Sequence, residues 1–238
     1  MNQITVLRSI KKPHSICDKK IKSCLIILYL FNNQLYEIIK ITGVCSDKIQ
    51  LVAFIQQNLS ISSIKAEEIA DRFTEKALLK NERILEENKV CNEYYFLVRG
   101  FIRAYTFDTS GNDITTGFYS GNQVASELYS FFKRVPSKET FQALSDCSTW
   151  YITFENLQVA FHSMPEFREF GRSMLVGAYG DLKQRMLSML HHTAEERYLH
   201  LVKSSPGIFQ HAPLKNIATY LGVTSTSLSR IRKELTRK

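Results

Sequence analysis

Residues 214–231 read LKNIATYLGVTSTSLSRI, and this order of residue types is typical of two short helices joined by a tight turn. Ala218 is small where a second helix must cross closely, and Gly222 can adopt the positive φ of such a turn. Thr224 is placed to cap a second helix that starts at Ser225. The sequence therefore predicts a helix-turn-helix, with a purely structural helical hairpin as the alternative.

The outer face of the second predicted helix is polar and basic. Its members are Ser225, Thr226, Ser229, Arg230 and Lys233. Hydroxyl and guanidinium groups can hydrogen-bond to base edges in a DNA major groove. Residues 191–238 hold eight basic and three acidic residues, which suggests a polyanion partner, with a solvated charged surface as the alternative. Together with Thr224, these residues are the predicted DNA-binding residues.

Composition and charge limit the class of protein. The chain has 238 residues, of which 44% are hydrophobic and 23% charged, as in an ordinary globular protein. Its net charge of +8 comes from the two ends, since residues 1–46 and 191–238 each carry +5 and residues 47–190 carry −2. No apolar stretch approaches the ~20 residues of a spanning helix. The sequence therefore predicts a protein that is neither disordered nor membrane-spanning.

The cysteines give no sign of a metal or disulfide framework. They are Cys17, Cys24, Cys45, Cys91 and Cys147. Their number is odd, they are widely spaced, and no C-x-x-C pair occurs. We expect free thiols in a reducing compartment that act as small buried hydrophobes, with no metal and no cofactor.

Residues 1–47 form a predicted extension of uncertain role. An apolar run at 24–31, preceded by basic residues, superficially resembles a signal peptide. No small-residue cleavage site follows this run, so we expect an intracellular, cytoplasmic protein.

The middle of the chain has a rhythm of short strands after a short amphipathic helix at 63–73. Strand-like runs lie at 94–98, 101–107, 114–119, 140–144 and 149–154. Turn residues separate them, so the region from about 78 to 154 is predicted to be an antiparallel roll. A metalloenzyme built on such a roll needs inward-facing histidines, but all six histidines lie outside this region. With no G-x-S-x-G, H-E-x-x-H or P-loop motif either, the sequence predicts no enzyme.

A helix of about 25 residues is predicted from Pro165. Its apolar stripe consists of Phe167, Phe170, Met174, Ala178, Leu182, Met186 and Met189, spaced by three or four residues. This spacing fits a dimerisation helix, and it equally fits a helix buried in the core of its own chain. Thr193 and Glu196 form a capping-box sequence that predicts the start of a further helix.

Over residues 48–238 the chain resembles the Crp/Fnr family of bacterial transcription regulators. The resemblance is carried by EYYFLVRGFIRAY at 93–105 and by TAEERYLHLVKSSPGIFQHAPLKNIATYLGVTSTSLSRIRKEL at 193–235. It implies an α+β fold in which an antiparallel, jelly-roll-like β-roll resembles a cyclic nucleotide-binding domain. The implied parts are the roll at 48–163, a long dimerisation helix at 164–190 and a helix-turn-helix DNA-binding domain at 191–238.

The same resemblance implies a homodimeric regulator that binds double-stranded DNA at a near-palindromic site. Ser225, Thr226 and Arg230 match the positions with which the family contacts bases, and Arg230 is the implied reader of a guanine. RNA polymerase and a small-molecule effector are the further partners that the family implies.

One departure concerns the ligand pocket. The family's cyclic-nucleotide binders hold the phosphate with a Gly-Glu-Leu turn and a following Arg-Ser pair, whereas this chain has Ser126-Glu127-Leu128 and then PSKET at 136–140. Without the arginine a charge-assisted phosphate clamp is lost. The candidate ligand residues are Glu127, Leu128 and Lys138, and we expect an effector other than a cyclic nucleotide. A cyclic-nucleotide-gated regulator, and an interaction protein that binds through its roll rather than to DNA, remain alternatives.

Overall fold

The structure is a computed structural model that describes residues 46–236. The predictions for Cys17, Cys24, Cys45 and the apolar run at 24–31 lie outside the described residues. Residues 47–236 belong to one compact unit, and the description below is of that unit.

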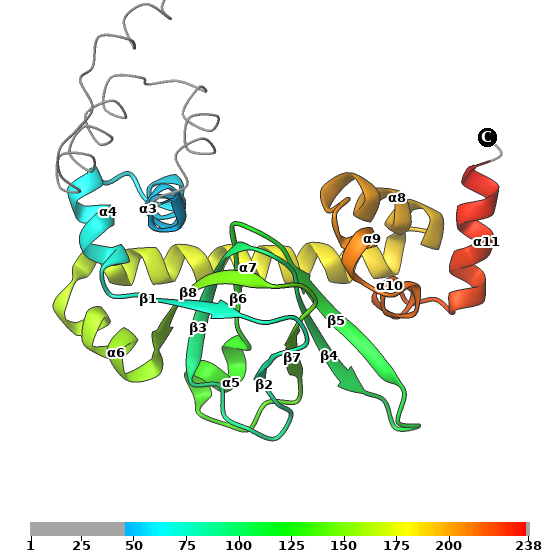
Figure 1. The fold of residues 1–238 in the computed structure, drawn as a ribbon, viewed down its shortest axis with the longest axis horizontal. Coiled ribbons are helices and arrows are strands. Elements are labelled where there is room, and N and C mark those ends of the chain that lie inside the picture. Colours follow the sequence, from blue (N-terminus) through cyan, green and yellow to red (C-terminus); the bar gives the residue numbers. More distant parts are fainter. Residues whose placement is uncertain (1–45, 237–238) are drawn as a thin grey trace, which may run out of the picture. The chain divides into compact units, whose positions relative to one another are not determined.

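The unit is built on a β-roll made of two four-stranded sheets (Figure 1). The strand order is β1-β8-β3-β6 in one sheet and β2-β7-β4-β5 in the other, and the strands pair antiparallel. The strands are β1 (Thr74–Leu78), β2 (Arg83–Leu85), β3 (Glu93–Arg99), β4 (Ile102–Phe107), β5 (Asp113–Tyr119), β6 (Gln123–Ala125), β7 (Thr140–Ala143) and β8 (Cys147–Thr153). The predicted fold class is therefore confirmed.

Gly100 makes the tight turn between β3 and β4. Its φ is +104°, a conformation that side-chain-bearing residues rarely adopt. A Cβ atom at this position would lie 2.5 Å from the Cys147 sulfur and 2.7 Å from the Asp146 carbonyl oxygen. Glycine is thus required here both by the backbone conformation and by the close approach of the chain before β8.

The β4–β5 hairpin is fixed at its tip and along its strands. At the tip, the Asp108 carboxylate accepts a hydrogen bond from the Asn112 amide at 2.8 Å. Along the strands, the buried Arg103 guanidinium pairs with Asp113 and donates to the Thr115 hydroxyl at 2.8 Å. Because a buried charge is tolerated only when it is paired and hydrogen-bonded, these contacts specify the hairpin register.

Helices complete the core of the roll. They are α3 (Ser46–Asn58), α4 (Ser63–Ala70), α5 (Leu128–Lys133), α6 (Phe154–Ser163) and α7 (Pro165–His191). Phe54 on α3 contacts Phe96 on β3 and Phe170 on α7, with ring centroids 4.7 and 6.2 Å apart. Leu51 and Ile55 of α3 are fully buried in the same core. The aromatic contacts therefore bind the first and last helices of the roll to its sheet.

The apolar stripe of α7 divides into two parts. Phe167 and Phe170 are 1% and 3% exposed and belong to the core of the roll. Farther along the helix, Leu182 and Met186 are 66% and 45% exposed. The N-terminal part of the stripe thus serves the chain's own core, whereas the C-terminal part is open to a further partner.

Four helices follow α7, and Figure 1 shows them gathered at its far end. They are α8 (Ala194–Ser204), α9 (Ile208–His211), α10 (Leu214–Tyr220) and α11 (Ser225–Leu235). The predicted capping box starts α8, since the Glu196 amide donates to the Thr193 hydroxyl at 3.2 Å and the Thr193 amide donates to the Glu196 carboxylate at 2.7 Å. A second core holds these helices together, formed by Leu144, Leu201, Ile208, Ala212, Ile217, Ala218, Leu221 and Leu228.

Candidate nucleic-acid interface and sensor pocket

The helix-turn-helix predicted at 214–231 is confirmed as α10, a turn and α11. Gly222 in the turn has a φ of +69°, and the Val223 amide donates to the Ala218 carbonyl at 3.0 Å. Ile217 on α10 and Leu228 on α11 are almost completely buried and meet in the second core. The two helices are therefore packed as one rigid element.

Thr224 is the N-cap residue of α11. Its hydroxyl oxygen accepts a hydrogen bond from the Ser227 amide at 3.1 Å and donates to the Ser227 hydroxyl at 3.0 Å. An N-cap of this kind satisfies one of the amides that a helix start leaves without a partner. The Thr224 side chain is thus engaged within the protein, at the start of α11.

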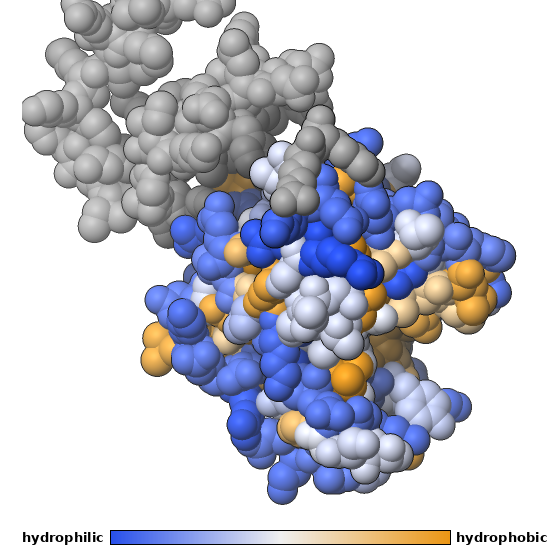
Figure 2. All heavy atoms as spheres, turned by 90° about the vertical axis from the view of Figure 1, so that its right-hand side faces the viewer, coloured by the Kyte–Doolittle hydropathy of each residue, from blue (hydrophilic) through white to orange (hydrophobic). Residues whose placement is uncertain are grey.

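The other predicted DNA-binding residues lie on one face of α11, and all of them are exposed: Ser225, Thr226, Ser229, Arg230 and Lys233. The Arg230 side chain is 75% exposed and lies 3.9 Å from the Glu234 carboxylate, a separation that leaves its guanidinium available. Figure 2 views the unit from the side on which α11 lies in Figure 1, and most residues on that side are hydrophilic. The structure therefore brings these five side chains together on an accessible polar surface.

The helix-turn-helix packs directly on the roll. The Thr115 amide on β5 donates to the Thr219 hydroxyl on α10 at 3.1 Å, and the rings of Phe118 and Tyr220 lie 4.9 Å apart. Leu144, which follows β7, belongs to the core of the helical part. Sequence reasoning missed this interface, because an outward-facing side chain on a strand carries no signal of what will cover it.

Two arginines hold the end of α10, and neither was singled out in the sequence. Arg185 on α7 donates to the Tyr220 carbonyl at 3.1 Å and lies 3.7 Å from the centroid of the Tyr220 ring. Arg197 on α8 donates twice to the Leu221 carbonyl, at 3.1 and 2.9 Å. Cationic groups at the carbonyl end of a helix satisfy acceptors that have no partner within the helix.

The candidate ligand residues Glu127 and Leu128 lie at the start of α5. The Glu127 carboxylate accepts hydrogen bonds from the amides of Tyr129 and Ser130, at 3.2 and 2.6 Å. Leu128 packs against the core of the roll. The amides at this turn therefore receive their negative partner from the chain itself.

The loop before β7 supplies no strong cation to this turn. Ser137 is buried, and its hydroxyl donates to the Glu139 carbonyl at 2.8 Å, whereas Lys138 is exposed. Burial raises the pKa of the Glu139 carboxyl, and the nearby Glu127 raises it further. Two carboxylates thus lie near each other at this turn, and Ser137 and Lys138 do not form a charge-assisted clamp for a phosphate there.

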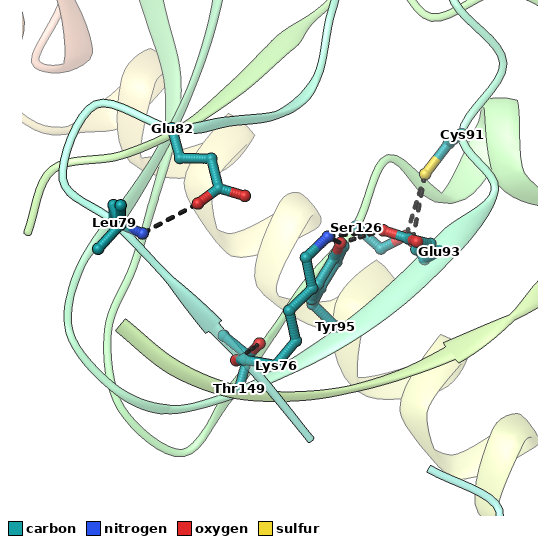
Figure 3. A network of polar contacts seen from close by, with 8 residues as sticks. All are labelled: Lys76, Leu79, Glu82, Cys91, Glu93, Tyr95, Ser126 and Thr149. Carbon is teal, nitrogen blue, oxygen red and sulfur yellow. Dashed lines mark hydrogen bonds and ion pairs between the residues drawn. The ribbon is translucent and has the colours of Figure 1, made fainter. Parts of the chain in front are cut away.

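A polar network lies beside the same turn (Figure 3). The Lys76 ammonium donates to the Tyr95 hydroxyl at 2.9 Å, that hydroxyl donates to the Glu93 carboxylate, and the Ser126 hydroxyl donates to the Glu93 carbonyl at 3.4 Å. Burial, followed by the Glu93 carboxylate, raises the pKa of Tyr95, so the phenol stays protonated. The network ties β1 and β3 to the turn before α5 and has a structural role.

Other kinds of site have no support in the described residues. Within residues 46–236, no group of three or more His, Cys, Asp or Glu side chains is placed to hold a metal ion. In the same part of the chain, no helix is long and apolar enough to cross a membrane. Cys91 and Cys147 are free and buried, as predicted for them, and burial raises the pKa of both thiols.

Comparison with known proteins identifies the roll. Residues 75–163 match the family model of the cyclic nucleotide-binding domain. No curated protein sequence matches the chain.

Several solved structures are similar to this chain in fold. FixK2 from Bradyrhizobium japonicum is 21% identical, with a TM-score of 0.57 over 69% of this chain and 85% of its own. CLP, a cyclic di-GMP-responsive global regulator from Xanthomonas campestris, is 13% identical, with a TM-score of 0.58 over 72% of this chain and 92% of its own. A transcriptional regulator of the Crp/Fnr family from Eubacterium rectale is 14% identical, with a TM-score of 0.59 over 74% of this chain and 84% of its own. The chain therefore contains a domain of the cyclic nucleotide-binding family and has the fold of the Crp/Fnr transcription regulators.

Proposed function

We propose that this protein is a sequence-specific DNA-binding transcription regulator that acts in the cytoplasm, where RNA polymerase is a further partner. The observation that carries the proposal is the exposed face of α11, on which hydroxyls and the exposed guanidinium of Arg230 project from a rigid helix-turn-helix. An arginine can bond to O6 and N7 of one guanine, which is the commonest specific contact in a major groove. Lys233, on the same face, is suited to a phosphate.

A homodimer is the second part of the proposal. Exposed apolar side chains continue along α7 at intervals of three or four residues, namely Val176, Tyr179, Leu182, Met186 and Leu190. Such a row has the spacing of a two-helix seam, and a contiguous apolar surface of this kind marks an interface. Pairing of α7 with its copy would present two α11 helices to a near-palindromic site, with half-sites about 34 Å apart.

The proposal assigns no cyclic nucleotide to the roll. The support is the pairing of Glu127 with the amides at the start of α5 and the absence of an arginine from the loop at 136–140. CLP is a cyclic di-GMP-responsive relative in fold, so the test includes that compound beside cyclic AMP and cyclic GMP. We expect none of the three to stabilise the protein, whereas a true ligand at a hundredfold excess over its Kd would add about 2.7 kcal/mol to the free energy of unfolding.

The direct test is selection of bound duplexes from a random DNA pool by the purified protein at a stated salt concentration. Recovery of a symmetric motif is the expected result. Bound duplexes without a common motif, together with weak binding, would favour an interaction protein that uses the roll or α7 for a partner other than DNA.

A further inference from the structure

The turn of the helix-turn-helix is held by the helix that carries the exposed apolar row. Arg185 lies on α7 between Leu182 and Met186, both of which are exposed. From there its guanidinium reaches the last turn of α10, where it meets both the carbonyl and the ring of Tyr220. One side chain therefore connects the proposed dimer seam with the element that carries α11.

A second contact from α7 supports the same connection. A Cβ atom at Gly222 would lie 2.6 Å from the terminal methyl group of Met189. Met189 is four residues after Arg185, so the two side chains emerge from adjacent turns on the same face of α7. The residues at 220–222 are thus seated directly on this face of the helix.

A shift of the turn at residues 220–222 would move α11 as a rigid body. The cap residue Thr224 comes two residues after Gly222, and Leu228 packs α11 against α10 in the second core. The side chains that are proposed to face DNA lie on the exposed face of α11, away from Leu228. The position of residues 220–222 therefore determines the direction of α11. A change in that position leaves the residue types on the exposed face of α11 unaffected.

Arg185 also lies close to the roll. Burial raises the pKa of the Glu139 carboxyl and of the Tyr119 phenol, and the positive charge of Arg185 opposes both shifts. The guanidinium thus stands where α7, α10 and the roll meet. Its hydrogen bond to the Tyr220 carbonyl is charge-assisted, and its planar guanidinium also lies over the Tyr220 ring, a combination that a more flexible ammonium does not reproduce.

We propose that Arg185 is a positioning residue for DNA recognition, which fixes the direction of α11 relative to α7 and thereby the half-site spacing that the dimer accepts. The inference rests on the proposed function and assigns to Arg185 a role that is distinct from reading bases. In a symmetric dimer, a change in the angle of α11 on one protomer is repeated on the other, so the separation of the two reading helices responds directly.

The test uses the full chain and duplexes that carry two copies of the selected half-site. The spacer between half-sites is either the selected one or is longer or shorter by one or two base pairs. The variants are Arg185→Ala and Arg185→Lys, and the matched control is Arg172→Ala, which removes an exposed arginine of α7 that pairs with Glu169. The readout is the ratio of affinities for the selected and altered spacers, measured within each variant. This ratio does not depend on the fraction of protein that is folded.

We expect this ratio to fall roughly tenfold in Arg185→Ala, because a charge-assisted bond and a stacked contact are both lost. Arg185→Lys should show a smaller fall, since it keeps the charge and loses the planar stack. Arg172→Ala should leave the ratio unchanged, and base preferences within a half-site should stay the same in all variants. An unchanged ratio in Arg185→Ala, even with weaker binding overall, would overturn the inference and leave the proposed function intact. Failure of the wild type to select any motif would overturn both.

Discussion

The backbone amide of Thr115 on β5 donates a hydrogen bond at 3.1 Å to the hydroxyl of Thr219 on α10, although the two residues are 104 positions apart in the chain. Thr115 is 2% exposed, so its amide has no access to water. The same Thr219 hydroxyl also lies 3.2 Å from the hydroxyl of Thr115, which in turn accepts from Arg103. The first helix of the helix-turn-helix is therefore joined, through Thr115, to the buried Arg103–Asp113 ion pair of the β4–β5 hairpin.

Replacing Thr219 by valine tests this junction. Valine has nearly the same shape but offers no acceptor, so the Thr115 amide would be buried without a partner. We expect Thr219→Val to lower the free energy of unfolding in urea by about 1–3 kcal/mol. Thr236→Val, at the exposed end of α11, should change it by less than about 0.5 kcal/mol. Equal effects of the two substitutions would argue against the junction.

Arg230 and Lys233, on the exposed face of α11, should differ in their effect on DNA binding. Arg230→Ala should weaken binding to the selected site by about 1–3 kcal/mol and relax the preference at one base pair in each half-site. Lys233→Ala should weaken binding to all sequences alike and reduce the slope of log affinity against log salt by about 1. Competition binding at several salt concentrations separates the two outcomes. If Arg230→Ala kept the full preference at each position, another residue would read that base.

The cap and contact roles of neighbouring threonines can be separated by stability. Thr224→Ala removes the acceptor of the Ser227 amide and should lower the free energy of unfolding by about 1 kcal/mol. Thr226→Ala, on the exposed face, should change stability by less than about 0.5 kcal/mol. Thermal or urea unfolding without DNA is the measurement. A stability loss at Thr226 rather than Thr224 would contradict the cap assignment.

The exposed row on α7 makes a prediction about the oligomeric state. Leu182→Glu places a charge in the centre of the proposed seam, where its desolvation is costly, so the dimer should dissociate. Val159→Glu on α6 introduces the same charge at a side chain of similar exposure, 58% against 66%, and should leave the dimer intact. Sedimentation equilibrium distinguishes the two. A Leu182→Glu variant that remains dimeric would move the interface elsewhere.

The buried carboxyl of Glu139 should make the stability of the protein depend on pH. Its folded-state pKa is raised, chiefly by burial, so the folded protein binds this proton more tightly than the unfolded chain. The resulting destabilisation is absent below the unfolded pKa of about 4.3 and grows as pH rises through the folded value. Glu139→Gln, which resembles the protonated form, should therefore be more stable than the wild type at pH 7, and the difference should shrink towards pH 4. A difference that grew on acidification would show the opposite sign of the shift.

Much of the fold is predictable from local patterns. Strand-like runs between turn residues predict β3, β4, β5, β7 and β8, and the apolar period of three or four predicts α7. The short strands β2 and β6, of three residues each, are too brief to show any alternation. β1, which begins at Thr74 rather than near 78, is mostly exposed and lacks an apolar run. Short or exposed elements are defined by the partner they pair with, and a single sequence does not reveal that partner.

The features of the candidate site also divide into those that the local sequence predicts and those that it does not. The capped helix, the turn glycine and the polar face of α11 follow from residue types at fixed spacing, so the sequence is sufficient to predict them. Arg185, Arg197 and Glu139 gain their roles from contacts with distant residues, and no local signal marks them. The α7 stripe is an intermediate case, because its period predicts burial but not whether the covering surface belongs to the same chain.

The proposed function requires that two copies of α11 read a symmetric DNA site. Its most direct test is the binding of the full chain to a selected duplex, to the same duplex with one half-site scrambled, and to a fully scrambled duplex, with the number of chains bound measured by sedimentation. We expect two chains on the intact duplex, an affinity at least about 10³-fold above that for the scrambled duplex, and a large loss of affinity when one half-site is scrambled. Equal affinity for all three duplexes would contradict the proposed function.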